Sequence, residues 1–179
     1  MQRWRVPLGF LSAAVFLFFA RPTWQTLVAG GIIALIGLAL RAWSAGHIRK
    51  NQKLAISGPY SWTRNPLYLG SFILGLGFTV ASNQPVLVLL FAGLFLGIYL
   101  SVMRVEARTL AELFGADYRE YAAAVPLFFP RLTPLRLTPQ NEDVAKFDGS
   151  LYIRYREYQA TLGALGAWGI LAAKTVFLS

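Results

Sequence analysis

Long uncharged runs are the feature of this sequence that most restricts its fold. Four windows carry no charged side chain: Val6–Ala20, Pro22–Leu40, Ser71–Met103 and Tyr158–Ala173. A membrane-spanning helix needs about 20 mostly apolar residues. The third window is too long for one helix and contains the turn signal Ser82–Pro85, so it predicts two helices. The sequence therefore predicts an all-α polytopic membrane protein with about five transmembrane helices.

Composition agrees with this interpretation, because 56% of the 179 residues are hydrophobic and only 14% are charged. Such a chain is too apolar for an ordinary soluble domain. The first window follows Arg3 and Arg5, as the apolar part of a signal peptide would, but no small-residue cleavage site follows it. We therefore interpret it as a span.

The placement of basic residues predicts the orientation of the chain. Of the 17 Lys and Arg residues, all but Arg21 and Lys174 lie on one side of the predicted spans, together with all eight acidic residues. Basic loops stay in the cytoplasm. We expect a protein of the cell's inner or plasma membrane with its N-terminus and active site in the cytoplasm. The net charge of +9 suits anionic lipid headgroups. Nucleic acid is not an expected partner, because no Arg/Lys-rich helix or RNA-binding signature appears.

The sequence also restricts the available chemistry. It contains no cysteine, which excludes a thiolate nucleophile, a disulfide and a cysteine-based metal site. Its one histidine, His47, cannot form a multi-histidine metal site, so no metal is expected. We expect His47 to be solvated or at headgroup level, with a general-base role as the alternative.

Two polar segments interrupt the apolar pattern. The first, Ser57–Gly70, reads SGPYSWTRNPLYLG, and the second covers Arg104–Pro130. Arg104–Tyr121 has the spacing of a helix that leaves the membrane and is broken near Gly115. These residues could be interface anchors, that is, an aromatic belt with snorkelling arginines. The density of proline, glycine and polar residues in one short loop instead favours a functional site.

The two segments together resemble the isoprenylcysteine carboxyl methyltransferase family, which is related to the phospholipid N-methyltransferases. The resemblance rests on GPYSWTRNPLYLG, a hydrophobic hairpin, and then E-x3-L-x3-FG-x2-Y-x2-Y-x3-VP-x3-P. It implies a single integral-membrane methyltransferase domain over residues 1–179, with a motif-bearing core at 54–130. Residues 140–179 would form a linker and an extra C-terminal transmembrane helix.

The resemblance further implies S-adenosylmethionine (SAM) as the cofactor, bound without a Rossmann domain; no G-x-G-x-x-G motif follows a strand in this chain. In the family, the loop and the helix after the hairpin surround the cofactor at the cytosolic face, and a lipid-like substrate enters between helices. The implied cofactor contacts fall in two segments and on one acid. They are Gln52, Lys53, Leu54 and Ala55 near the adenosine, Tyr60, then Asn65, Pro66, Leu67 and Tyr68 near the methionine moiety, and Glu106.

Glu106 and Arg64 are the implied catalytic residues, the first in an electrostatic role and the second holding the loop through a bidentate contact. Three positions depart from the family pattern. Asn65 stands where the family has histidine, and Ala107 replaces a second glutamate. Val102 stands where carboxyl methyltransferases carry a substrate-contacting arginine, and Arg104 lies two residues later as the candidate substrate residue. The departures predict a retained cofactor site and leave the methyl acceptor open.

The sequence thus predicts an integral-membrane, SAM-dependent methyltransferase acting on a lipophilic small molecule, with methyl transfer to a carboxylate or another heteroatom. Such a displacement needs orientation and exclusion of water more than acid–base chemistry. One alternative is a non-catalytic membrane protein that keeps the scaffold for lipid binding or assembly. A second is an NADPH-dependent reductase, because sterol reductases share a related membrane module.

Overall fold

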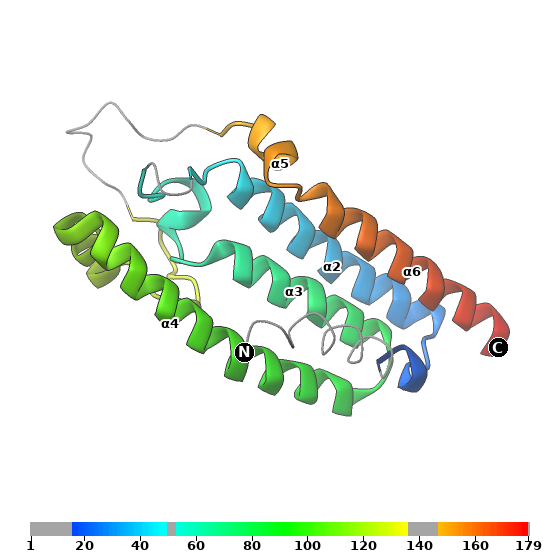
Figure 1. Cartoon of the computed structure of the whole chain (residues 1–179). Helices are drawn as coiled ribbons and strands as arrows, with labels where there is room; N and C mark the ends of the chain where they lie inside the picture. The colour runs from blue at the N-terminus through cyan, green and yellow to red at the C-terminus, as the bar shows by residue number, and fades with distance from the viewer. Residues whose placement is uncertain (1–15, 50–52, 136–146, 179) are drawn as a thin grey trace.

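The structure, a computed structural model, describes residues 16–49, 53–135 and 147–178, and this part of the chain is helical. Its long helices lie side by side in a bundle, and the loop after α2 and the short α5 gather at one end (Figure 1). Only an isolated bridge between Arg49 and Lys53 has strand-like pairing in the described residues. The elements are α2 (Trp24–Ala45), the 3-10 helix η2 (Gly58–Ser61), α3 (Pro66–Ala81), α4 (Pro85–Ala124), α5 (Ser150–Arg154) and α6 (Tyr158–Leu178).

The predicted all-α membrane fold is confirmed. Three described helices, α2, α4 and α6, are long and apolar enough to cross a membrane. The fourth apolar helix, α3, has 16 residues, fewer than the roughly 20 that a full span needs. Four of the five predicted spans therefore correspond to helices, although α3 is shorter than a full span. Most of the first predicted span, Val6–Ala20, lies outside the described residues.

Local sequence signals set the helix boundaries. Thr23 caps α2 by exchanging hydrogen bonds with Thr26 across the first turn. Pro66 and Pro85 open α3 and α4 at the first helical position, where the missing N–H costs no helical hydrogen bond. The turn at Ser82–Gln84 separates these two helices, as its sequence predicts.

Small residues bring α2 and α3 into close contact. A Cβ atom added at Gly77 would lie 2.6 Å from both the Ala34 nitrogen and the Gly30 oxygen. Gly37 and Gly70 make the corresponding approach nearer the loop end of the helices. Lipid supplies no hydrophobic force that drives helices together, so membrane helices associate through the van der Waals packing that such close approaches allow.

Helix α6 packs on the outside of this pair. The Trp168 ring lies 5.1 Å from the Phe78 ring, measured between centroids, and near Gly31. At the far end, the Lys174 ammonium donates to the carbonyl oxygens of Leu17 and Phe18 at 2.6 and 2.9 Å. Lys174 therefore satisfies backbone acceptors that an apolar surrounding would leave unpaired.

Helix α4 changes character along its length. Its first half exposes large apolar side chains, among them Val86, Leu89 and Leu94, as expected of a lipid-facing surface. The second half is charged, and Gly115 interrupts it with φ 56° and ψ −121°, which confirms the predicted break. Glycine adopts this conformation without the steric cost that a Cβ atom would add.

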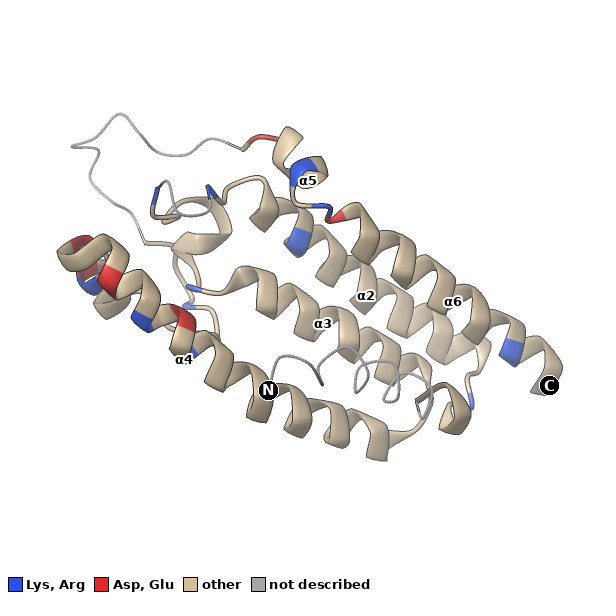
Figure 2. Ribbon diagram, in the orientation of Figure 1, with Lys and Arg blue, Asp and Glu red and all other residues tan. Residues whose placement is uncertain are grey.

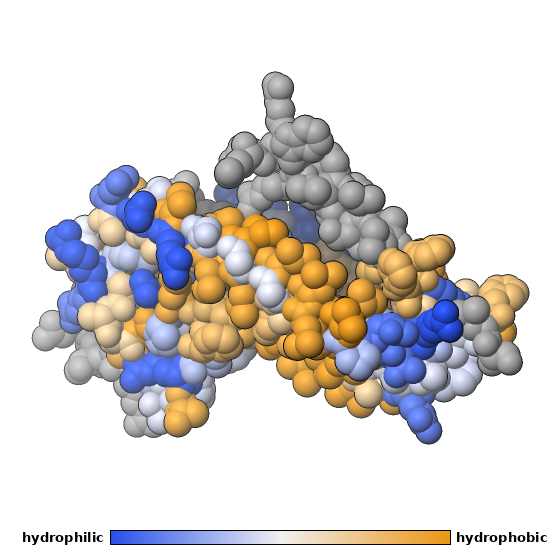
Figure 3. Space-filling view, turned by 90° about the horizontal axis from the view of Figure 1, so that it is seen from below, coloured by the Kyte–Doolittle hydropathy of each residue, from blue (hydrophilic) through white to orange (hydrophobic). Residues whose placement is uncertain are grey.

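Charged residues are concentrated at one end of the bundle. Figure 2 shows them on the second half of α4, on the loop after α2 and around α5, with few at the opposite end. Between the two ends runs an apolar surface over the helices (Figure 3). This separation matches a membrane protein with one strongly charged face.

A substitution of Gly77 tests the α2–α3 contact. We expect Gly77→Ala to destabilise the protein by about 1–3 kcal/mol, the usual cost of overpacking, because the neighbouring atoms belong to backbone. Gly97→Ala is the matched control, since no atom lies within 4 Å of a Cβ added there. Thermal unfolding in detergent would measure both. Equal melting temperatures for the two variants would contradict the close contact.

Candidate functional site

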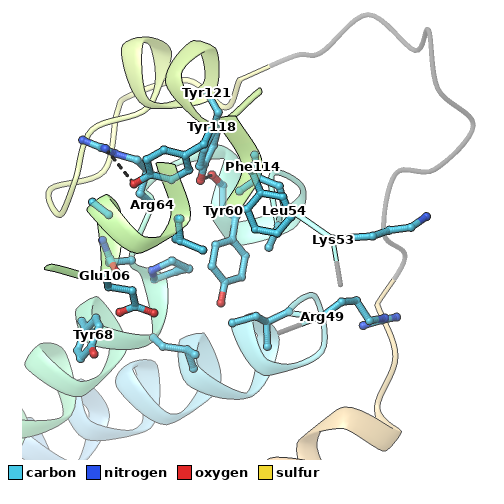
Figure 4. A pocket seen from close by; sticks show the side chains of 17 residues that line it. Arg49, Lys53, Leu54, Tyr60, Arg64, Tyr68, Glu106, Phe114, Tyr118 and Tyr121 are labelled. Atoms are coloured by element: carbon cyan, nitrogen blue, oxygen red, sulfur yellow. Dashed lines mark hydrogen bonds between the residues drawn. The ribbon is translucent and has the colours of Figure 1, made fainter. Parts of the chain in front are cut away.

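A cavity of about 230 Å³ lies where the loop after α2 faces the second half of α4. It joins the two polar segments that the sequence singled out, although about 40 residues separate them along the chain. Its lining comprises Ile48, Arg49, Lys53, Leu54, Ala55, Tyr60, Arg64, Asn65, Pro66, Leu67, Tyr68, Glu106, Ala107, Leu110, Phe114, Tyr118 and Tyr121. Figure 4 shows side chains from the loop, α3 and α4 converging on it.

Most residues that the resemblance marked lie around this cavity. They are Lys53, Leu54, Ala55, Tyr60, Arg64, Asn65, Pro66, Leu67, Tyr68 and Glu106. Gln52 lies outside the described residues. Arg104 is exposed and does not line the cavity, so its role toward the substrate stays a prediction.

The cavity includes seven residues that the site prediction missed. They are Ile48, Arg49, Ala107, Leu110, Phe114, Tyr118 and Tyr121. Five of them lie on α4: Ala107 is next to Glu106, and the other four follow Glu106 at steps of three and four residues. Extending the face of Glu106 along the helix would have found those four. Ile48 and Arg49 follow the end of α2, and no sequence pattern marked them.

The loop's first turn is built over His47. Gly58 has φ 58°, and a Cβ atom there would lie 2.5 Å from the His47 Nε2, so only glycine fits. The His47 ring is 7% exposed, and its Nδ1 lies 3.0 Å from the Trp43 carbonyl oxygen. The prediction of a solvated or headgroup-level histidine was wrong, because the chain folds back over the ring.

Hydrogen bonds fasten the rest of the loop to the segment after α4. The Arg64 N–H donates to the Pro126 oxygen at 3.0 Å, and the Thr63 hydroxyl donates to the Phe128 oxygen at 2.8 Å. The Asn65 Nδ2 donates to the Leu127 oxygen at 2.9 Å. The asparagine that replaces the family's histidine therefore holds the loop in place through its amide nitrogen.

Tyr60 presents an unpaired hydroxyl to the cavity. The side chain is 6% exposed, and its hydroxyl has no hydrogen-bond partner among the described residues. Tyr121 donates to the Tyr60 carbonyl oxygen at 2.7 Å, which fixes the backbone, and Figure 4 shows the Tyr60 hydroxyl directed into the cavity. A buried polar atom without a partner carries a desolvation cost that a ligand can relieve.

Burial is the main cause that raises the pKa of Tyr60 above its ordinary value of 10.0, and nearby Tyr121, Glu106 and Glu157 add to it. Burial also raises the pKa of Tyr121, although Arg64 acts in the opposite direction. Both phenols therefore stay protonated at physiological pH and can donate hydrogen bonds.

Within the described residues, Arg64 makes no bidentate contact of the kind that was predicted for it. Its Nη1 donates to the Tyr118 hydroxyl at 3.3 Å, and its Nε is buried with no acceptor in the described part of the chain. No carboxylate pairs with it in that part. Arg64 thus connects the loop to α4 through Tyr118 (Figure 4).

Glu106 supplies the acid of the cavity. Its carboxylate is turned toward the space between Tyr68 and Tyr60 (Figure 4). The two ion pairs of the described residues involve other acids, Glu157 and Asp148. Glu106 is exposed, so its carboxylate is open to an incoming ligand. It is suited to a cationic ligand.

The profile of one protein family, described as phospholipid methyltransferase, matches residues 26–117, slightly more than half of the chain. The chain belongs to this family. The match covers α2, η2, α3 and most of α4, including both sides of the cavity, and it leaves α5 and α6 outside. The predicted resemblance to membrane methyltransferases is confirmed.

Relatives of two kinds share similarity with the chain. The cobalt-zinc-cadmium resistance protein CzcN of Cupriavidus metallidurans is 40% identical over 144 residues, 74% of this chain and 64% of the relative. The nickel-cobalt-cadmium resistance protein NccN of Alcaligenes xylosoxydans xylosoxydans is 31% identical over 74% of this chain and 65% of its own. Protein-S-isoprenylcysteine O-methyltransferase of Saccharomyces cerevisiae is 30% identical over 58% of this chain and 46% of its own.

The chain thus spans less than two thirds of the length of these curated relatives. No solved structure matches it. Among the described residues, no group of three or more His, Cys, Asp or Glu side chains could hold a metal ion.

Replacing Tyr60 by phenylalanine tests the unpaired hydroxyl. At neutral pH we expect Tyr60→Phe to be as stable as the wild type or up to about 1 kcal/mol more stable, because no hydrogen bond is lost. A raised folded-state pKa contributes stability that is present below pH 10.0 and is lost as the pH rises above it, when the unfolded chain ionises first.

The variant should therefore lose less stability than the wild type when thermal unfolding in detergent is followed upward from about pH 9. A marked destabilisation at neutral pH would show that the hydroxyl has a protein partner.

Proposed function

We propose that the protein is an integral-membrane, SAM-dependent methyltransferase that acts on a lipophilic small molecule and transfers the methyl group to a carboxylate or another heteroatom. The observation that carries the proposal is the cavity that joins the two motif segments and contains the Glu106 carboxylate and the unpaired Tyr60 hydroxyl. Membership of a methyltransferase family supports it.

The chemistry of the cavity fits SAM, whose sulfonium supplies the methyl group when it is bound. Glu106 forms no ion pair with the residues that the structure describes, and it suits the positive charges of the methionine moiety. Phe114, Leu110 and Leu54 provide the apolar and aromatic surface that a purine ring needs. In this assignment Gln52, Lys53, Leu54 and Ala55 border the adenosine, and Asn65 to Tyr68 border the methionine moiety.

Catalysis would then rest on placement and electrostatics. The loop is held by hydrogen bonds to backbone oxygens of residues 126–128, so Tyr60 and Asn65 keep fixed positions. Fixed positions allow an in-line displacement to occur without a large entropic cost. Glu106 acts electrostatically, and Arg64 acts as a positioning residue through Tyr118. Nothing in this proposal requires a general base.

The alternative of a scaffold without activity has a specific observation in its favour, because two of the relatives carry names of metal-resistance proteins. One assay separates the two functions. Purified protein is incubated with SAM and a membrane lipid extract, and S-adenosylhomocysteine is measured. Turnover excludes the non-catalytic scaffold, and its absence together with intact SAM binding would favour that scaffold.

Removal of the Glu106 charge tests the cofactor site. We expect Glu106→Gln to weaken SAM binding roughly tenfold or more, because a charge-assisted contact contributes about 1.5–3 kcal/mol. Glu112→Gln is the control, since Glu112 is an exposed acid of the same helix that does not line the cavity. Titration with SAM in detergent measures both. Equal affinities for the two variants would contradict the site assignment.

The absence of cysteine makes the orientation directly testable. We propose that the cavity faces the cytoplasm. A membrane-impermeant maleimide applied to intact cells should label Gln25→Cys, at the exposed start of α2, and should leave Asp117→Cys, on the charged end of α4, unlabelled until the membrane is opened. Labelling of Asp117→Cys alone would reverse the proposed orientation.

A further inference from the structure

A second cavity, of about 430 Å³, lies among α2, α3, α6 and the residues that precede α2. Its lining is mostly apolar or small, with two polar side chains at one end. The lining residues are Phe16, Leu17, Arg41, Ser71, Leu74, Gly75, Phe78, Ala160, Gly163, Ala164 and Ala167. A volume of this size is within the range of cavities that hold small-molecule ligands.

The second cavity continues from the first along one face of α3. Leu67 lines the first cavity, whereas Ser71, Leu74 and Phe78 line the second. Steps of four, three and four residues keep all four side chains on the same side of a helix. The two cavities therefore follow each other along α3, the one at its loop end and the other farther into the apolar part of the bundle.

The polar end of the second cavity is a junction of three helices. The Arg41 guanidinium donates to the Ser71 hydroxyl of α3, and to the Glu157 carboxylate before α6 at 2.6 Å. The side chains of this ion pair are only 20% and 12% exposed. The Ser71 hydroxyl donates to the carbonyl oxygen of Leu67 at 2.9 Å, and Leu67 lines the first cavity, so the junction lies one helical turn from that cavity.

Unpaired donors point to the kind of ligand that would fit here. Three buried side-chain atoms of the described residues lack a hydrogen-bond partner, namely Arg41 Nε, Tyr60 Oη and Arg64 Nε. All three can donate, and all belong to residues that line one of the two cavities. Buried donors are normally satisfied. A ligand that brings oxygen acceptors would satisfy all three, whereas an ammonium group could donate only to the Tyr60 oxygen and would leave both arginine N–H groups unpaired.

We propose that the second cavity binds the apolar chain of a single-chain amphiphile and that Arg41 holds its oxygen-bearing head where α2, α3 and α6 meet, one turn of α3 from the first cavity. This inference rests on the proposed function, because it makes the amphiphile the methyl acceptor. The volume of about 430 Å³ is toward the lower end of the range for small-molecule sites, which favours one apolar chain over two.

Helix α6 creates the space for that chain. Its four lining residues are alanine or glycine, and a Cβ atom added at Gly163 would meet no atom within 4 Å. This helix lies outside the part of the chain that matches the family. The part of the site that accepts the chain is therefore built by a helix that the family match does not include.

Filling the cavity tests the site. The probe is palmitic acid with a diazirine in its chain, photolysed with the full-length protein in detergent, and the labelled peptides are identified by mass spectrometry. We expect labels on α3 and α6 in the wild type and about tenfold less labelling in Gly163→Leu. Gly169→Leu is the matched control, because Gly169 is equally open but lies on the opposite face of α6.

A second pair of variants tests how Arg41 recognises the polar head of the ligand. Glu157→Gln removes the carboxylate that pairs with Arg41, and labelling by the palmitic acid probe should be retained or strengthened. The double variant Arg41→Gln, Glu157→Gln removes both charges of the pair, which avoids a buried unpaired ion. It should label equally with the palmitic acid probe and with the corresponding alcohol, whereas the wild type should prefer the acid by about tenfold.

Unchanged labelling of Gly163→Leu, labels mainly on the lipid-facing half of α4, or a wild type without preference for the acid would each overturn the inference. SAM binding is measured on the same preparations. A wild type that binds the probe in this cavity but does not bind SAM would refute the proposed function while leaving the amphiphile site intact.

Discussion

The candidate site depends on a set of hydrogen bonds that join two distant parts of the chain. Thr63, Arg64 and Asn65 donate to carbonyl oxygens of residues 126–128, so the loop after α2 is held against the end of α4. Without these bonds the polar groups of the loop would have to form hydrogen bonds with water or with lipid headgroups. The wall of the cavity that the loop forms would then have no fixed position. Proline at both ends of the 126–130 segment keeps that segment out of a helix, and bends at residues 127–129 leave its carbonyl groups available as acceptors.

The position of the loop is fixed because the helices before and after it, α2 and α3, are in close contact. Glycine residues let the backbones of α2 and α3 approach, and Arg41 ties both helices to Glu157 at the start of α6. A charged pair at this depth is expensive to desolvate, and its geometry repays the cost only when several polar atoms share it. Arg41 of this pair lines the second cavity, so the rigid part of the fold and the proposed acceptor site share this side chain.

The electrostatics of the two cavities are complementary to different ligands. Glu106 presents on the side of α4 a carboxylate that forms no ion pair with the described residues, which suits a cationic cofactor. Arg41 presents on the side of α2 and α3 a donor, Nε, that has no partner in the described residues, which suits an acceptor that carries oxygen. A methyl donor and its acceptor would thus be held from opposite sides, with the transferred group between them. This arrangement supplies orientation, which is what a displacement at a sulfonium requires.

The sequence by itself determined the membrane fold, the two polar segments and the family. A chain of this length cannot bury such long apolar runs in a soluble core, so the runs predict membrane helices. The prolines and glycines that shape the loop, and the break at Gly115, are local sequence signals. The tertiary structure decided what the side chains do. His47 is buried because Gly58 folds over it, Asn65 is engaged with the Leu127 carbonyl, and Arg64 contacts Tyr118 in place of a carboxylate. It also decided that Arg41 and Glu157 form a pair, although 116 residues separate them. Sequence spacing carries no information on such partners, because they depend on how the helices pack in three dimensions.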